Sequence, residues 1–173
     1  EMLFRSTEAM SKYISGVILY DETIWQNAKD GTPLVKLIEA AGMIPGIKVD
    51  KGAKGLAGAE GEKITEGLDG LRDRLNEYYK LGARFTKWRA VIAIGDGIPS
   101  QYCIDANAHA LARFAALSQE AGLVPIVEPE VLMDGDHTIA RCADVTLSTL
   151  ESVYQELERQ GVELEGTLLK PNM

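Results

Sequence analysis

Short apolar runs alternate along this sequence with longer segments in which apolar residues recur three or four positions apart. The short runs are rich in β-branched residues and predict five strands, at residues 16–20, 44–50, 85–92, 123–130 and 164–169. Helical spacing predicts four main helices, at residues 34–41, 65–81, 101–121 and 137–160. A glycine follows each of these helices, and glycine readily adopts the left-handed backbone of a helix end.

Regular alternation of strand and helix is typical of a parallel sheet with right-handed crossovers, so the pattern predicts an α/β fold. The repeating unit leaves two architectures open, an open sheet and a (β/α) barrel. Scattered apolar positions in residues 1–13 predict a short helix or a lead-in segment. No linker interrupts the series, and we therefore expect a single domain over residues 1–173.

Two glycine-containing segments have partial similarity to phosphate-binding loops. Residues 51–63 (KGAKGLAGAEGEK) do not have P-loop spacing, and we interpret them as a mobile loop. Residues 95–100 begin like a dinucleotide-binding pattern, but Ser100 stands where the third glycine belongs. We interpret Ser100 as the N-cap of the next helix. His109 is expected to be a partner-satisfied or surface histidine and not a ligand, and His137 a turn or cap residue.

Composition excludes several classes of function. The chain has 26 acidic and 18 basic residues, a net charge of −8, which argues against nucleic acid as the main partner. Two cysteines that form no CxxC pair indicate a reducing compartment such as the cytoplasm. Two histidines make a histidine-rich metal site improbable, and we expect no metal. No apolar run reaches the roughly 18 residues of a membrane span.

Charged residues gather at the carboxyl ends of the predicted strands. Four of the five strands carry at least one, and together they are Lys48, Lys87, Arg89, Glu128, Glu130 and Lys170. One such residue is ordinarily a side chain that reaches solvent on its aliphatic stem. In both α/β architectures, however, the carboxyl ends of the strands carry the functional site. The repetition therefore predicts a pocket that contains several cations and two carboxylates.

Such a pocket suits Schiff-base chemistry on a phosphorylated sugar. Cations bind phosphate groups and carbonyl oxygens. An uncharged lysine amine is a nucleophile toward carbonyl carbon, and Lys170 ends an apolar strand. A neighbouring carboxylate can move the protons that form and break a carbinolamine. The residues thus indicate carbon–carbon chemistry that needs no metal and no cofactor.

Seven stretches of the sequence carry a resemblance to a known family. They are residues 16–23, 46–52, 67–71, 87–89, 124–130, 134–137 and 165–173, and they occur in the family's order. On these motifs the sequence resembles class I fructose-bisphosphate aldolase. The resemblance implies a (β/α)8 TIM barrel, a tetramer in many members, and a role in glycolysis and gluconeogenesis. It also implies the reversible cleavage of fructose 1,6-bisphosphate to dihydroxyacetone phosphate and glyceraldehyde 3-phosphate.

The resemblance implies a role for each charged strand end. Lys170 corresponds to the Schiff-base lysine, Glu128 to the general acid/base, and Glu130 to its carboxylate neighbour. Lys87 corresponds to a lysine that assists substrate binding and catalysis. The resemblance also implies that Lys48 and Arg89 bind substrate, and that Arg89 does so at a phosphate group.

Part of the family's sequence has no counterpart here. The first strand with its active-site aspartate, the last two strands and the C-terminal tyrosine are not found. We therefore expect a partial barrel, roughly strands two to six, and a portion of a longer protein. Two alternatives remain open: a non-catalytic interaction scaffold with the same fold, and another Schiff-base barrel enzyme such as a transaldolase.

Overall fold

The computed structural model describes residues 10–172 and contains a five-stranded sheet in which every pairing is parallel. In spatial order its strands are β1 (Gly16–Leu19), β2 (Ile44–Lys48), β5 (Phe85–Ile92), β6 (Val124–Val131) and β7 (Leu168–Leu169). Spatial order follows chain order, as expected when each strand is laid beside the previous one by a crossover. The five predicted strands and the α/β class are confirmed.

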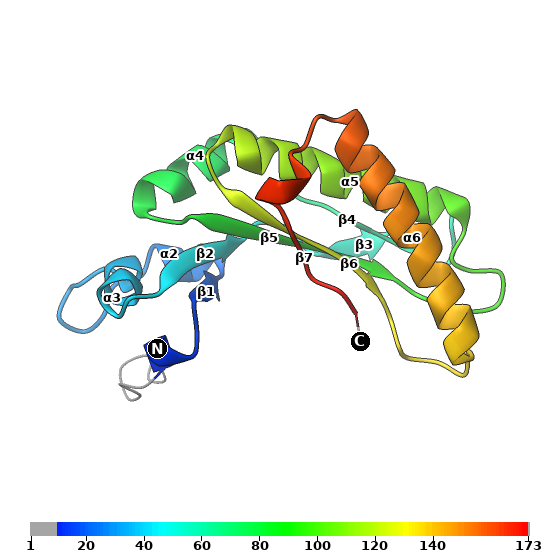
Figure 1. Cartoon of the computed structure of the whole chain (residues 1–173), viewed down its shortest axis with the longest axis horizontal. Coiled ribbons are helices and arrows are strands. Elements are labelled where there is room, and N and C mark those ends of the chain that lie inside the picture. Colours follow the sequence, from blue (N-terminus) through cyan, green and yellow to red (C-terminus); the bar gives the residue numbers. More distant parts are fainter. Residues whose placement is uncertain (1–9, 173) are drawn as a thin grey trace.

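Helices connect the strands. They are α2 (Asp21–Ile24), α3 (Leu34–Ala40), α4 (Leu71–Leu81), α5 (Gln101–Glu120) and α6 (Ile139–Arg159). Figure 1 shows α4 and α5 along one face of the curved sheet, and β7 lies beside β6 at its edge. Of the N-terminal segment expected as a helix, residues 1–9 lie outside the described residues, and Met10–Lys12 form a single 3₁₀ turn.

The strand β5 explains why the two faces of the sheet differ. Its alternate residues Thr86, Trp88, Ala90 and Ile92 are fully buried. Trp88 stacks on Phe114 of α5, with ring centroids 5.6 Å apart. Because side chains alternate along a strand, burial of these residues under α5 turns Lys87 and Arg89 to the opposite, open face.

An aromatic ring fills the open face at the amino-terminal end of the sheet. The ring of Phe85 lies against Gly46 and Gly16, and a Cβ at Gly46 would overlap that ring. Glycine at these two strand positions therefore permits close packing across β1, β2 and β5. Lys48 and Lys87 lie further along β2 and β5 than this ring.

The sequence did not predict the hairpin formed by β3 (Ala53–Gly55) and β4 (Lys63–Thr65). Residues 51–63 were expected to be a mobile loop, and part of that segment instead forms strands. The helix expected from Thr65 is wrong, because Thr65 ends β4. The Thr65 hydroxyl donates to the Arg89 carbonyl (2.8 Å), and its N–H donates to Asn107 Oδ1 (3.4 Å). These contacts join segments distant in sequence. The helix α4 begins only at Leu71, after Gly70 adopts a left-handed backbone (φ 64°).

Two smaller corrections concern element ends. The last strand begins later than predicted, because Leu164–Gly166 form a 3₁₀ turn and only Leu168–Leu169 pair with β6. The N-cap of α6 is Thr138, whose hydroxyl accepts from the Arg141 N–H (3.2 Å), rather than His137. Ser100 is confirmed as the N-cap of α5, since its hydroxyl accepts from the Cys103 N–H (3.1 Å).

The two edges of the sheet lead to a first prediction. Among the described residues, β1 and β7 each pair with one strand only, and Ile18 and Leu168 on them are 42% and 54% exposed. Unpaired apolar edges favour association between chains. We expect the 173-residue chain to self-associate in sedimentation velocity, and Ile18→Lys with Leu168→Lys to shift it toward monomer.

The matched control is Leu147→Lys, which places the same charge on an exposed residue of the helix α6 and not on an edge strand. This variant should associate as the parent does. A parent chain that sediments as a monomer at all concentrations would contradict the prediction.

Candidate active site

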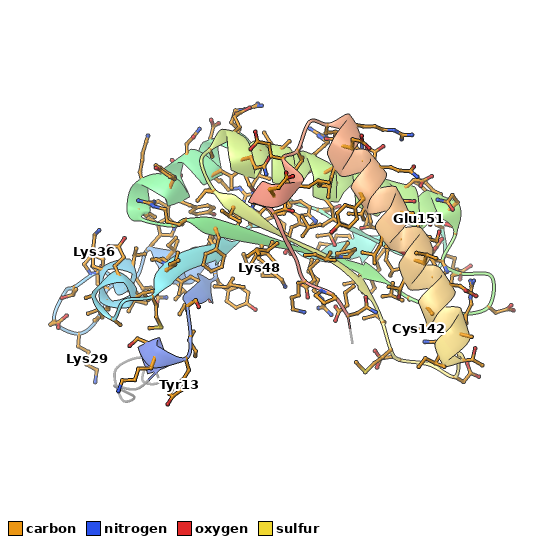
Figure 2. All side chains as sticks on the ribbon, viewed as in Figure 1. Tyr13, Lys29, Lys36, Lys48, Cys142 and Glu151 are labelled. Carbon is orange, nitrogen blue, oxygen red and sulfur yellow. The ribbon has the colours of Figure 1, made fainter. Side chains whose placement is uncertain are left out.

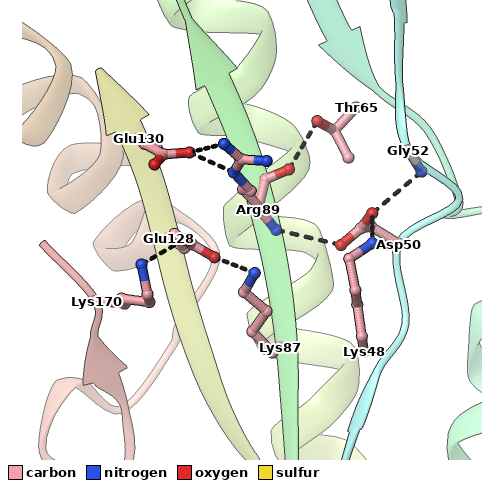
Figure 3. Close-up of polar contacts among 9 residues, drawn as sticks. All are labelled: Lys48, Asp50, Gly52, Thr65, Lys87, Arg89, Glu128, Glu130 and Lys170. Atoms are coloured by element: carbon pink, nitrogen blue, oxygen red, sulfur yellow. Dashed lines mark hydrogen bonds and ion pairs between the residues drawn. The ribbon is translucent and has the colours of Figure 1, made fainter. Parts of the chain in front are cut away.

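All six predicted site residues lie on the open face of the sheet, on four adjacent strands or directly after one of them (Figure 3). Strand register brings them together, because Lys48 is aligned with Lys87 and Arg89 is aligned with Glu128. Figure 2 shows Lys48 on the face of the sheet away from α4 and α5. The structure therefore brings the six charges together on one face, whereas the prediction that all of them lie late in a strand is wrong for Lys87, the third residue of β5.

Glu128 lies at the centre of the cluster between two lysines. Lys170 Nζ donates to Oε1 of Glu128 (2.7 Å), and Lys87 forms an ion pair with Oε2. Glu128 is 3% exposed and the Lys87 side chain 13%, whereas the Lys170 side chain is 51% exposed. One carboxylate thus joins a buried cation to a lysine that an incoming molecule can reach.

The pKa of Glu128 results from two opposing effects. Burial raises it, since the charged carboxylate loses water, but the hydrogen bonds from Lys170 and Lys87 outweigh burial. The pKa of Glu128 is therefore held below its ordinary value of 4.5. At neutral pH this group is a carboxylate, placed to accept a proton from either amine.

The lowered pKa of Glu128 predicts a loss of stability in acid. A carboxyl group whose pKa falls on folding stabilises the protein fully above its ordinary value of 4.5, and this contribution disappears as pH falls through the lowered folded-state pKa. We expect the midpoint temperature of thermal unfolding to decrease as the pH falls below 4.5, and this decrease to be less steep in Glu128→Gln. Equal acid dependence in the two proteins would contradict this assignment.

A second ion pair lies one pleat further along the same strands. The Arg89 guanidinium contacts Oε2 of Glu130 through Nε and Nη2. Both side chains are partly exposed, and the pair opens to the same face as Glu128. Glu130 therefore has Arg89 as its partner, while Lys170 has Glu128. The two carboxylates predicted for the pocket have separate cations.

Sequence reasoning did not name Asp50 or Thr65 as site residues, although both contact this cluster. Asp50 pairs with Lys48, and Thr65 holds the Arg89 carbonyl. A sequence signal existed for Asp50, which follows Lys48 by two positions and so shares its strand face. No such signal existed for Thr65, because its contact depends on the hairpin.

Within residues 10–172, no three His, Cys, Asp or Glu side chains are grouped so that they could hold a metal ion. In that range no helix has both the length and the apolar character to cross a bilayer. His109 lies on the surface, 3.0 Å from Glu156, as expected.

Comparison with known proteins shows which proteins this chain is similar to in sequence. The family model described as fructose-bisphosphate aldolase class-I matches residues 1–173. A Xanthomonas campestris protein named as a class 1 fructose-bisphosphate aldolase is 64% identical over 171 residues, which cover 99% of this chain and 51% of that protein. Fructose-bisphosphate aldolase 6, cytosolic, of Arabidopsis thaliana is 56% identical over 173 residues, covering 100% of this chain and 48% of that protein.

A solved structure gives the same result in three dimensions. Fructose-bisphosphate aldolase from Plasmodium falciparum, crystallised with TRAP and a small-molecule inhibitor, superposes with a TM-score of 0.94 at 50% identity. The match covers 96% of this chain and 49% of that one. The chain thus spans about half the length of the relatives it matches. The partial-barrel expectation for the fold class is confirmed, with five parallel strands.

Proposed function

Because the chain belongs to the class I fructose-bisphosphate aldolase family, we propose that it carries the Schiff-base centre for reversible cleavage of fructose 1,6-bisphosphate. The observation that supports this most directly is the position of Glu128, which contacts Lys170 with one oxygen and Lys87 with the other. A nucleophilic amine beside a carboxylate is the pair that imine chemistry requires.

In the proposed reaction, the uncharged Lys170 amine attacks the C2 carbonyl carbon of the sugar and forms a carbinolamine. Glu128 carries a proton from the nitrogen toward the oxygen, which leaves as water on further protonation and yields a cationic imine. Lys87 lies on the other side of Glu128, where its charge stabilises the negative charge that develops on the carbonyl oxygen as the amine attacks.

The imine then accepts electrons from the bond between C3 and C4. A carboxylate takes the proton of the C4 hydroxyl, the bond breaks, and glyceraldehyde 3-phosphate departs as an aldehyde. The electron pair remains on the Lys170 adduct as an enamine. Protonation at C3 and hydrolysis of the imine release dihydroxyacetone phosphate and restore the amine. This cycle requires no cofactor and no metal.

The remaining cations suit the substrate's phosphate groups. Arg89 offers a planar guanidinium and Lys48 a compact ammonium, and both side chains are partly exposed on the open face. We propose a phosphorylated sugar as the ligand, and neither nucleic acid nor membrane as a partner, in keeping with the net charge of −8. A cytoplasmic location is supported by plant relatives named cytosolic or cytoplasmic. A homo-oligomer, with a tetramer as the first expectation, is proposed from family resemblance.

Borohydride trapping tests the proposed function. The chain is incubated with dihydroxyacetone phosphate, reduced, digested and analysed by mass spectrometry for the modified lysine. We expect one adduct, on Lys170. The same experiment is done on a chimera in which residues 1–173 replace the matching half of the Xanthomonas campestris relative.

Comparison of the 173-residue chain with the chimera distinguishes an incomplete pocket from a wrong assignment of function. An adduct in the chimera alone would show that the chemistry is correct but needs the rest of the barrel. An adduct distributed over surface lysines in both proteins, or absent from both, would reject the aldolase proposal.

A further inference from the structure

Asp50 lies directly after β2, and its side chain is only 2% exposed. A buried carboxylate is costly unless its oxygens have partners. Oδ1 contacts the Lys48 ammonium and accepts from the Gly52 N–H (3.1 Å), and Oδ2 accepts from the Arg89 N–H (3.3 Å) (Figure 3). One carboxylate thus contacts both cations to which we assign phosphate binding, the first at its side chain and the second at its backbone.

The contact with Arg89 replaces a missing strand contact. The paired register of β2 and β5 ends where Lys48 lies beside Lys87, and one more backbone bond follows, from the Val49 N–H to the Lys87 carbonyl (3.1 Å). Beyond it the chain leaves the sheet at Gly52, which adopts φ 91°. The Asp50 side chain then accepts the Arg89 N–H, for which β2 no longer provides a carbonyl.

The contact with Lys48 restricts a flexible side chain. A lysine has four rotatable bonds, and ordering it on a ligand costs conformational entropy. The Lys48 side chain is 23% exposed, so its ammonium can meet a ligand while it remains paired with Asp50. Preorganisation of this kind increases affinity because less freedom is lost on binding.

We propose that Asp50 is a positioning residue for the substrate phosphate remote from the imine, acting through Lys48 and Arg89. This inference rests on the proposed function. Lys48 lies on β2, three strands from β7 and Lys170, and strands are spaced about 4.8 Å apart, so the two strand ends are roughly 14 Å apart. The phosphate next to the imine carbon belongs near β7. The phosphate at the far end of a six-carbon sugar belongs toward β2.

The test compares two ligands that differ in this remote phosphate. In Asp50→Asn, in the 173-residue chain and in the chimera, we expect the dissociation constant for fructose 1,6-bisphosphate to rise about tenfold. Trapping of dihydroxyacetone phosphate on Lys170 should be unchanged, because this ligand lacks the remote phosphate. In steady-state kinetics of the chimera, KM should rise while kcat remains the same.

Control variants separate positioning from loss of folding. Asp21→Asn changes a carboxylate after β1 that accepts from Tyr78 (2.7 Å), and it should leave the affinity for the bisphosphate unchanged. In a Lys48→Met background, Asp50→Asn should raise the dissociation constant for the bisphosphate by a smaller factor than it does in the parent, since part of its effect passes through Lys48. Should Asp50→Asn fail to fold, Asp50→Glu keeps the charge, displaces it by one methylene, and should lose part of the same affinity.

Three outcomes would overturn the proposal. They are unchanged bisphosphate affinity in a folded Asp50→Asn or Asp50→Glu protein, an equal loss with both ligands, and fully additive losses with Lys48→Met. A parent and chimera that trap no adduct on Lys170 reject the proposed function, and this inference with it, before Asp50 is changed.

Discussion

Replacement of Lys170 by methionine should abolish the borohydride-trapped adduct and reduce sugar-phosphate cleavage in the chimera by at least about 10³-fold. Methionine has nearly the length of lysine but no amine, so no imine can form. Because the Lys170 side chain is 51% exposed and its strand is at an edge, the fold should change little. Intact-protein mass after reduction measures the adduct, and circular dichroism checks the fold.

The matched control for this variant is Lys36→Met. Lys36 is an exposed lysine of α3 whose ion pair with Glu39 (2.7 Å) lies on the outside of the protein. This variant should trap the same single adduct as the parent. Persistence of the adduct in Lys170→Met, or its loss in Lys36→Met, would show that another lysine carries the chemistry.

Replacement of Glu128 by glutamine should slow imine formation by about 10²- to 10³-fold, because the amide can neither accept nor return a proton. It should also destabilise the protein by roughly 3 kcal/mol, since Lys87 would lose the counter-charge that offsets its burial. Chemical denaturation measures the second effect, and the rate at which the trapped adduct appears measures the first.

Glu151→Gln on α6 provides the same chemical change at an exposed position, and neither quantity should respond to it. A Glu128→Gln protein with the parent's rate of adduct formation would remove Glu128 from the proton-transfer role. An unchanged stability would show that Lys87 finds another partner.

The aldolase motifs and the strand pattern together predict the site residues. The alternation in β5 is an example, since apolar Trp88 between Lys87 and Arg89 dictates that both cations face away from the helices. The N-cap at Ser100 and the glycine ends of the helices could also be predicted from the sequence, because a cap depends on residues three or four positions apart. Such features are local, and the sequence displays local features directly.

The sequence did not predict which charged side chains pair with one another across the sheet. The sequence predicted two carboxylates among several cations. The register of β5 against β6 sets Arg89 beside Glu128, and only the side chains of the folded structure pair Glu128 with Lys87 and Glu130 with Arg89. The hairpin of β3 and β4 was missed because each strand has only three residues and Asn107 of α5, distant in sequence, holds β4 in place. Segments some 40 residues apart in sequence meet there.

The sequence by itself determined the α/β alternation, the face on which each charge lies and the family to which the chain belongs. The tertiary structure decided which charge meets which, where the hairpin packs, and that Asp50 joins Lys48 to Arg89. The physical reason is that burial follows from periodicity along one strand, whereas the choice of partner follows from the relative placement of strands that no local pattern records.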